Sequence, residues 1–328
     1  MPPRKLPLGS LILLGLMVSV GIGIAFLFRQ SSTSGAVTVQ GEVPIESSAE
    51  AKAISREYGY EQHFVEGAMA MPLQRSIAHV VTQPADTTLS IAVAADLSTV
   101  EDFAKQTDAN YIINGGFFDP NNGKTTSHLV AQGQIIGDPE SNERLIENPA
   151  LSQYMPQILN RSEFRVYCCP ETDALVHDIT FRDALPPNGC ELKTAIGAGP
   201  QLLPDDTSLT EAFVDYDDGA VIRDAVGSLQ PNARSAIGLY PEGAIALIMV
   251  EKGPNSTGLT FSELADFAAS LGITKLLNLD GGSSSSLFVA SDVVTRDGAT
   301  SSQTYFGRSD ADGNPIRRAV KSVIFLKD

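Results

Sequence analysis

The residues best suited to chemistry stand in one short stretch, Leu276 to Phe288, which reads LLNLDGGSSSSLF. Its first apolar residues are typical of a short strand buried on both faces, and Asp280 stands at the end of that strand. Gly281 and Gly282 allow a ligand to approach the backbone closely, and the N–H groups of Ser283 to Ser286 can line an anion-binding concavity. A carboxylate beside several donors suits chemistry on a charged sugar or a phosphate. The alternative is a plain turn, because Asp, Gly and Ser are the commonest turn residues.

A second polar turn is predicted at the end of another strand. Residues Thr88 to Ala95 alternate as a strand does, Leu97 to Gln106 follow a helical pattern, and Tyr111 to Ile113 are apolar again, which predicts a strand–helix–strand crossover. The last strand runs into NGGFFDP at Asn114 to Pro120. The Asn114 side chain can hold a ligand hydroxyl there, while the two phenylalanines fit the core below. A glycine turn over a buried aromatic pair is the alternative.

Composition and charge favour an ordinary globular protein that does not bind nucleic acid. The chain has 328 residues, of which 43% are hydrophobic and 19% are charged, so it can bury one large core or two modest ones. Its 23 basic and 39 acidic residues give a net charge of −16. This charge disfavours binding to nucleic acid, because no basic field is present to replace phosphate counterions. An anionic substrate would therefore need arginines placed locally at its site.

The N-terminus has the features of a membrane anchor. Residues Leu6 to Phe28 form a run of 23 residues without a charge, which is long enough to cross a hydrocarbon core of ~30 Å. A signal peptide removed near Ser34 to Ala36 is the alternative. Arg4 and Lys5 precede the run and glutamates follow it. The positive-inside rule then places the rest of the chain on the periplasmic or extracellular side of the membrane.

The composition after this run predicts the domain boundaries. The segment up to about Ala53 is rich in Ser, Thr, Gly and Glu and has few large apolar residues, which is typical of a flexible tether. We therefore predict a membrane anchor over residues 1–29, a tether over residues 30–60 and a folded domain over residues 61–328.

Three cysteines, Cys168, Cys169 and Cys190, predict one disulfide in an oxidising compartment. Cys190 with one member of the neighbouring pair would close a loop of about 20 residues and stabilise the fold by about 3 kcal/mol. Three unpaired thiols that pack as small hydrophobic residues are the alternative.

The sequence predicts no cofactor and no metal. It lacks the C-x-x-C pair and the histidine-rich cluster of a structural zinc site. One acidic segment is a weak candidate for calcium, but it lacks the spacing of a dedicated loop and is more typical of a solvated surface. It consists of Asp205, Asp206, Asp215, Asp217 and Asp218.

The middle of the chain is irregular, and the part that follows it is regular. Gly137 to Glu191 contains a helical patch near Ala150 to Asn160 but no persistent period, so we interpret it as a long excursion without a functional signal. Ala233 to Val250 predicts a β-hairpin. Thr260, with Glu263 three residues on, predicts a capping box that opens an amphipathic helix.

Two charged residues that precede Asp280 in the sequence have two interpretations each. Glu263 is a candidate catalytic partner of Asp280, but its spacing from Thr260 is typical of a helix cap. Arg234 is either one partner of a surface ion pair or a cation held inward over a pocket. The small apolar neighbours of Arg234 favour the second interpretation.

Six segments together resemble the phosphodiester glycosidase family, and they occur in the family order. The resemblance covers about residues 75 to 326 and excludes much of the cysteine-containing middle. The segments are NGGFF at Asn114 to Phe118, GAGPQL at Gly197 to Leu202, ARSAIG at Ala233 to Gly238, TFSELA at Thr260 to Ala265, LNLDGGSSS at Leu277 to Ser285, and Arg318 before the last strand.

The resemblance implies a site for a sugar phosphodiester. It implies Asp280, Arg234 and Asn114 as catalytic residues, with Asp280 as nucleophile or water-activating base, and it implies that Arg318 binds the phosphate. It also places two glycine turns and two serines against the substrate. These residues are Gly115, Gly116, Gly281, Gly282, Ser283 and Ser284. The chain differs from the family at Ser283, where a third glycine is common.

From these patterns we predict an α+β fold, a single domain with a mixed β-sheet and packed helices, preceded by one N-terminal transmembrane helix. The expected function is hydrolysis of the glycosidic bond of a sugar-1-phosphodiester in cell-surface or exopolysaccharide glycans. The expected partners are that anionic glycan and, through the N-terminal helix, the membrane. A non-catalytic polysaccharide-binding protein of the cell envelope is the alternative. A serine hydrolase is disfavoured because no G-x-S-x-G elbow is present.

Overall fold

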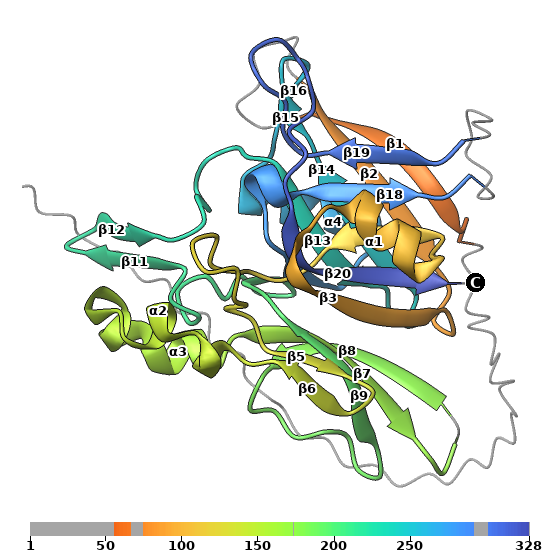
Figure 1. Cartoon of the computed structure of the whole chain (residues 1–328), viewed down its shortest axis with the longest axis horizontal. Helices are drawn as coiled ribbons and strands as arrows, with labels where there is room; N and C mark the ends of the chain where they lie inside the picture. The colour runs from red at the N-terminus through yellow and green to blue at the C-terminus, as the bar shows by residue number, and fades with distance from the viewer. Residues whose placement is uncertain (1–55, 67–74, 173, 292–300, 328) are drawn as a thin grey trace, which may run out of the picture. The chain divides into compact units, whose positions relative to one another are not determined.

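Strands dominate the ribbon in Figure 1, a computed structural model that describes residues 56–66, 75–172, 174–291 and 301–327. These residues belong to the second of the chain's two compact units, Ser55–Asp328. Strands account for 46% of the structure and helices for 15%, and the longest described helix, α4 (Phe261–Ser270), has ten residues. The predicted α+β class with packed helices is therefore wrong, and the fold is mostly β.

The predicted transmembrane helix and tether lie outside the described residues. Within the described ranges, every helix is too short or too polar to cross a membrane. The error in the fold class has a physical cause. The alternation of charged and apolar residues in β7 (Ser162–Cys169) covers only Glu163 to Val166, and β8 (Ala174–Phe181) has no regular alternation, so the middle of the chain gave no persistent strand signal.

The first of three large sheets contains six antiparallel strands in the order β1-β2-β14-β13-β17-β10. The strands are β1 (Gly59–Glu66), β2 (Arg75–Gln83), β10 (Gln201–Leu203), β13 (Arg234–Leu239), β14 (Ile245–Val250) and β17 (Lys275–Asn278). The predicted hairpin is confirmed, because β13 and β14 pair directly with Arg234 opposite Val250. The predicted capping box is also confirmed, and it begins α4 at Thr260.

The second sheet has five strands in the order β19-β18-β4-β20-β3. They are β3 (Thr88–Ser98), β4 (Tyr111–Asn114), β18 (Ser286–Val289), β19 (Gln303–Phe306) and β20 (Val320–Lys327). The predicted strand–helix–strand crossover is confirmed by β3, α1 (Val100–Thr107) and β4. The last strand, β20, lies between β3 and β4 and is antiparallel to both, so β3 and β4 run in the same direction.

The third sheet has the order β6-β5-β9-β7-β8 and is built largely from the segment predicted to be an excursion. Its strands are β5 (Leu129–Ala131), β6 (Gln134–Gly137), β7 (Ser162–Cys169), β8 (Ala174–Phe181) and β9 (Glu191–Gly197). The predicted helical patch is present as a 3-10 turn, η2 (Pro149–Tyr154), followed by α3 (Met155–Leu159). The remaining short elements are η1 (Pro139–Ser141), α2 (Glu143–Ile146), β11 (Val214–Asp217), β12 (Ala220–Asp224), β15 (Lys252–Gly253), β16 (Ser256–Thr257) and η3 (Gly282–Ser284).

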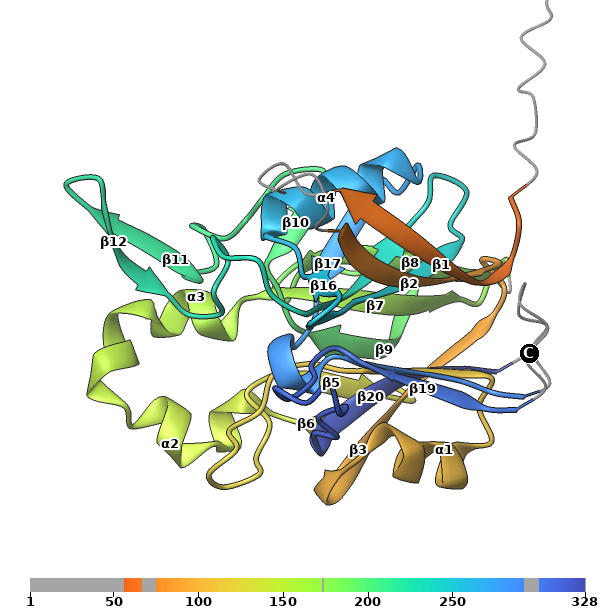
Figure 2. The ribbon, with the colours of Figure 1, turned by 90° about the horizontal axis from the view of Figure 1, so that it is seen from above.

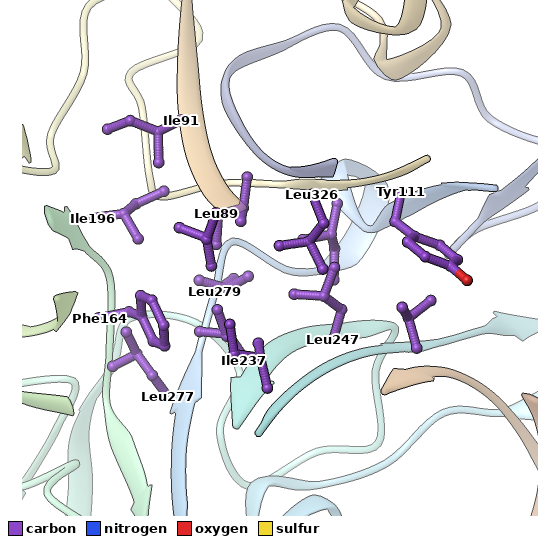
Figure 3. Close-up of a cluster of buried hydrophobic side chains, with 14 of the residues drawn as sticks. Leu89, Ile91, Tyr111, Phe164, Ile196, Ile237, Leu247, Leu277, Leu279 and Leu326 are labelled. Atoms are coloured by element: carbon purple, nitrogen blue, oxygen red, sulfur yellow. The ribbon is translucent and has the colours of Figure 1, made fainter. Parts of the chain in front are cut away.

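The main core lies where the inner faces of the three sheets meet (Figure 3). Ile237 of the first sheet, Tyr111 of the second and Phe164 of the third all contribute to it. Alternate residues of the same strands point outward, where α4 covers the first sheet and α1 covers the second, on opposite sides of the molecule in Figure 2. Because both faces of the central strands are buried, their ends are held rigidly, and the polar turns described below follow these ends.

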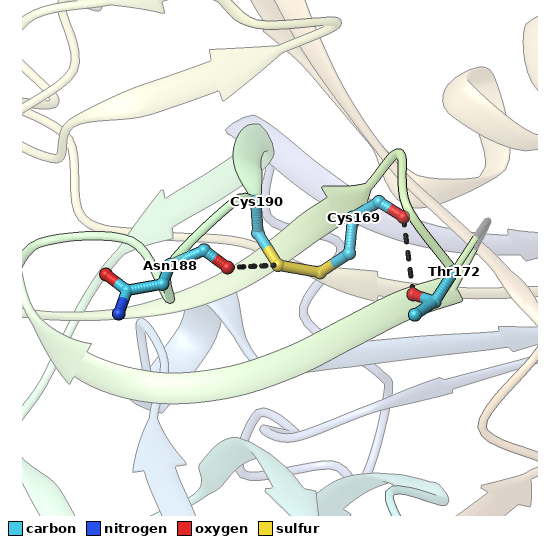
Figure 4. Close-up of a disulfide and its surroundings, with 4 residues drawn as sticks. All are labelled: Cys169, Thr172, Asn188 and Cys190. Carbon is cyan, nitrogen blue, oxygen red and sulfur yellow. Dashed lines mark hydrogen bonds between the residues drawn. A yellow bond between two sulfur atoms is a disulfide. The ribbon is translucent and has the colours of Figure 1, made fainter.

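One disulfide closes a loop at the edge of the third sheet. Cys169 at the end of β7 is bonded to Cys190, 21 residues later, as Figure 4 shows. This confirms that Cys190 pairs with one member of the neighbouring cysteines, and Cys168 remains a free thiol.

Candidate functional site

The ends of three strands, one from each large sheet, meet at one place. β4, β9 and β17 all end here, and backbone hydrogen bonds join the segments that follow them. Asp280 N donates to Gly115 O at 3.1 Å, and Gly199 N donates to Asn278 O at 2.9 Å. The two polar turns predicted from the sequence are therefore neighbours in space.

The buried side chain of Asn114 fixes the turn that carries Asp280. Its Nδ2 donates to Asp280 O at 2.6 Å, while its Oδ1 accepts hydrogen bonds from Ser235 Oγ at 2.6 Å and from Ser286 N at 3.1 Å. The amide thus holds both ends of the turn. With its oxygen occupied by two protein donors, Asn114 positions Asp280 instead of offering that oxygen to a ligand hydroxyl.

The carboxyl group of Asp280 is partly buried and has an unusual acidity. Burial raises its pKa to about 6, against the opposing effects of hydrogen bonds from the Ser284 side chain and the Gly281 N–H and of the positive charge of Arg318. A carboxyl group with this pKa changes its protonation state near neutral pH, which is typical of a group that acts in proton transfer or nucleophilic attack.

The serine turn uses most of its own backbone donors. Gly282 has φ +64°, in the left-handed region, and its N–H donates to Ala233 O at 2.9 Å. The N–H groups of Ser284 and Ser285 donate to carbonyl groups within the turn at 3.2 and 3.3 Å. With the Ser286 N–H on Asn114, three of the four serine amides are occupied by protein acceptors, while Ser283 is half-buried at the start of the turn.

Arg318 supplies a cation beside Asp280. It is half-buried, its guanidinium lies 5.8 Å from the centre of the Phe118 ring, and its charge lowers the pKa of Asp280. Within the described part of the chain, no carboxylate forms an ion pair with it and no carbonyl accepts a hydrogen bond from it. The structure thus brings Asp280 and Arg318 together and leaves the guanidinium donors available to an anion.

Arg234 has a different environment from the one predicted. Its side chain is 1% exposed and lies over the Phe261 ring at 4.4 Å. The guanidinium donates four hydrogen bonds to backbone oxygens, which are Leu259 O at 2.9 Å, Val226 O at 3.3 Å, Gly227 O at 2.6 Å and Gln230 O at 2.8 Å. Burial lowers its pKa to about 10, so it stays charged at neutral pH. Arg234 therefore holds the loop of residues 226–230 to β13 and has little left to offer a phosphate.

Glycines are required in the two turns mainly by close packing. A Cβ atom on Gly115 would lie 2.5 Å from Ser322 Oγ, and one on Gly116 would lie 2.4 Å from Gly197 O. On Gly281 it would lie 3.1 Å from the oxygen of Ala233. These glycines allow the ends of strands from different sheets to approach one another. They are therefore needed to assemble the site even where they do not contact a ligand.

A second basic group, Arg161, lies just before β7 and was not predicted from the sequence. Its guanidinium lies 3.8 Å from the centre of the Phe213 ring and 5.9 Å from that of Phe117, which follows the glycine turn. Burial lowers its pKa to about 10, and the charge of Glu211 opposes this effect. Only a pattern linking residues about 50 positions apart could have predicted this contact.

A buried ionic cluster on the third sheet was also missed. His128 Nδ1 lies 2.7 Å from Glu163 Oε1, and Arg165 Nε donates to Glu163 Oε2 at 2.8 Å. Charged residues on alternate positions of β7 were concealed by the irregular pattern of the middle segment. The cluster satisfies its own charges, so it stabilises the sheet next to the site.

The acidic segment considered for calcium is engaged in local contacts. Asp206 Oδ1 accepts a hydrogen bond from Ser208 N at 2.8 Å, and Asp215 Oδ2 accepts one from Tyr154 Oη at 2.7 Å. Over the described ranges, no group of three or more His, Cys, Asp or Glu side chains has the geometry to hold a metal ion.

Comparison of this mostly β chain with known proteins identifies its family. The family model for phosphodiester glycosidases matches residues 107–327. The chain belongs to the phosphodiester glycosidase family.

Solved structures show the same fold at low sequence identity. The catalytic domain of zebrafish N-acetylglucosamine-1-phosphodiester alpha-N-acetylglucosaminidase, auto-inhibited by its pro-peptide, is 15% identical, with a TM-score of 0.56 over 82% of this chain and 88% of that one. A hypothetical protein from Synechocystis is 16% identical, with a TM-score of 0.51 over 82% of this chain and 62% of that one. A comparison with curated proteins found no match.

Proposed function

We propose that this chain hydrolyses the glycosidic bond of a sugar-1-phosphodiester in cell-surface or exopolysaccharide glycans. The observation that carries the proposal is the proximity of Asp280, whose pKa is about 6, to the guanidinium of Arg318, which has no ion-pair partner among the described residues, at the meeting point of three strand ends. Membership of the phosphodiester glycosidase family supports the same reaction class.

The charges at the site match those that develop in this reaction. Breaking the bond between the anomeric carbon and the phosphate oxygen develops positive charge on the sugar and negative charge on the leaving phosphate. The ionised Asp280 carboxylate stabilises the sugar and attacks its anomeric carbon or activates a water. Arg318 donates to the phosphate oxygens with its planar fork.

A single carboxylate can suffice because the leaving group is a phosphate. Ordinary glycosidases use a second carboxylic acid to protonate a poor alkoxide leaving group. A phosphodiester oxygen leaves as a weakly basic anion and needs little protonation, so the arginine takes the place of the acid. Asn114 contributes by positioning, since its hydrogen bond to Asp280 O fixes the backbone that carries the carboxylate.

The reaction takes place, in our proposal, on the periplasmic or extracellular side of the membrane. The Cys169–Cys190 disulfide supports this location, because such bonds persist in oxidising compartments. Glycans of the cell surface are accessible there.

Asp280→Asn tests the proposal directly. The variant keeps the side-chain volume but removes the negative charge, and we expect hydrolysis of a sugar-1-phosphodiester to fall by about 10²-fold or more. Asp266→Asn, the same substitution on the exposed face of α4, is the matched control and should keep full activity. Free sugar is measured by chromatography. NMR identifies the anomer that is released first: retention of configuration indicates that Asp280 is a nucleophile, and inversion indicates that it is a base.

Two results would contradict the proposal. Turnover by Asp280→Asn at the rate of the control would remove Asp280 from the mechanism. Glycan binding by both variants without release of any sugar by the parent chain would favour a polysaccharide-binding protein instead.

A further inference from the structure

A cavity of about 830 Å³ with a basic wall lies beside the segment that leads to Arg318, since Ile316 is one of its lining residues. Its basic lining residues are Arg75, Lys252 and Arg308, and its polar lining includes Asn255, Ser256 and Thr257. A concentration of cations is unexpected in a chain with a net charge of −16. The volume is in the range of sites that hold small molecules.

Backbone hydrogen bonds connect the wall of this cavity to the turn that carries Asp280. Gly307 N donates to Ser285 O at 2.7 Å, and Lys252 N donates to Gly307 O at 2.6 Å. Arg308, which follows Gly307, forms a parallel bridge with Lys252. The cavity is therefore attached to the proposed catalytic turn through a single residue, and the loop that bears Arg308 continues to Arg318.

Two of the three cations of the wall, Lys252 and Arg308, form no ion pair among the described residues, whereas Arg75 Nε lies 4.0 Å from Glu66 Oε1. Across the described ranges, the guanidinium of Arg308 has no hydrogen-bonding or ion-pair partner. Lys252 Nζ donates to Pro231 O, which leaves two of its three N–H groups. Burial lowers the pKa of Lys252, and the positive charges of Arg308 and Arg234 lower it further.

The two acidic residues of the lining are engaged elsewhere. Glu263 Oε2 accepts hydrogen bonds from the backbone N–H and hydroxyl of Thr260, both at 2.9 Å, in the helix cap. Asp310 accepts bonds from Asn314 N at 2.8 Å and from Asp312 N at 2.9 Å within its own turn. The lining contains three cations and two carboxylates, so the cavity has a small net positive charge.

We propose that this cavity is an anion-binding subsite that receives a second phosphate group of the substrate, next to the phosphodiester that is cleaved. The substrate would then be a glycan with closely spaced phosphates, held by Arg308 and Lys252 at one phosphate and by Arg318 at the other. The identity of the substrate rests on the proposed function, whereas anion binding by the cavity does not.

Binding of inorganic phosphate tests the subsite without catalysis. Phosphate is titrated into the full chain carrying Asp280→Asn at low salt, and binding is measured by calorimetry. Adding Arg308→Met or Lys252→Met should weaken phosphate binding about tenfold or more, because each removes charge-assisted hydrogen bonds. Arg317→Met is the matched control, since Arg317 is exposed on the same loop and lies outside the lining. Thermal unfolding confirms that each variant is folded.

A second experiment links the subsite to turnover. In the parent chain, Arg308→Met should raise KM about tenfold for a sugar-1-phosphodiester with a second phosphate on its aglycone, and should leave KM unchanged when that phosphate is absent. Equal effects on both substrates would overturn the proposal.

The phosphate titration has its own refuting outcomes. The proposal fails if the Asp280→Asn chain does not bind phosphate, if Arg317→Met weakens binding as much as Arg308→Met, or if Arg318→Met alone abolishes it. Failure of the proposed function appears separately, as retained turnover by Asp280→Asn, so the two failures are distinguishable.

Discussion

Asp280→Asn is expected to stabilise the fold at neutral pH while it removes activity. Burial raises the pKa of Asp280 from 3.8 to about 6, so the folded state binds this proton more tightly than the unfolded state does. Its contribution to stability is therefore fully present below about pH 4 and is lost as the pH rises through about 6. The shift of about two pKa units corresponds to about 3 kcal/mol.

The expected difference can be measured by unfolding at several pH values. Asn has no charge to lose, so the variant should become more stable relative to the parent chain as the pH rises. Linkage predicts that the difference in unfolding free energy grows by about 2 kcal/mol between pH 4.5 and pH 7.5. This corresponds to roughly 4 to 8 °C in Tm for a unit of this size.

Asp102→Asn is a control of opposite sign. Asp102 is exposed, and its hydrogen bonds from Lys105 and Thr99 hold its pKa below the ordinary value, so its ionised form stabilises the fold above the unfolded pKa. That variant should gain no stability at pH 7.5. If Asp280→Asn were no more stable than the parent chain at pH 7.5, or if the difference did not depend on pH, Asp280 would not be a buried charge of the kind described.

Three further predictions follow from the geometry. The value of kcat/KM should fall below about pH 6 as Asp280 is protonated, to about a tenth of its pH 7 value at pH 5, and an acid limb near pH 4 in the pH–rate profile would contradict the assignment. Arg234→Met should lower the unfolding free energy by more than about 3 kcal/mol in denaturant titrations, because it leaves buried carbonyls unpaired, whereas Arg318→Met should keep stability and lose activity about 10²-fold. Gly116→Ala should destabilise the fold by about 1–3 kcal/mol, since its Cβ would lie 2.4 Å from Gly197 O, and unchanged stability would refute the packing argument.

The elements that could be predicted are those with local signals. The hairpin of β13 and β14 has a turn between two apolar runs, and α4 begins with the side-chain chemistry of Thr260 and Glu263. The crossover from β3 to β4 has a change of period at each boundary. The polar ends of β4 and β17 were also visible in the sequence, because glycines and polar residues follow short apolar runs there.

The parts that could not be predicted depend on contacts between distant segments. The third sheet buries the charged residues Glu163 and Arg165 of β7, and the sequence does not show the distant segments that cover them. Arg234 was assigned to the ligand because the sequence shows only a buried cation and not the backbone carbonyls that satisfy it. Arg161 meets Phe213 only because two loops fold over the same strand ends.

The charges around Asp280 determine how the acid limb of the pH–rate profile should shift when substrate binds. Arg318 lowers the pKa of Asp280 in the free protein. A bound phosphodiester partly neutralises that guanidinium and brings its own negative charge close to the carboxylate, and both effects favour the protonated carboxyl. The acid limb of kcat, which reports the substrate complex, should therefore lie at higher pH than the limb of kcat/KM, which reports the free enzyme. In Arg318→Met the kcat/KM limb should itself move to higher pH, and an unchanged limb would show that Arg318 does not act on Asp280.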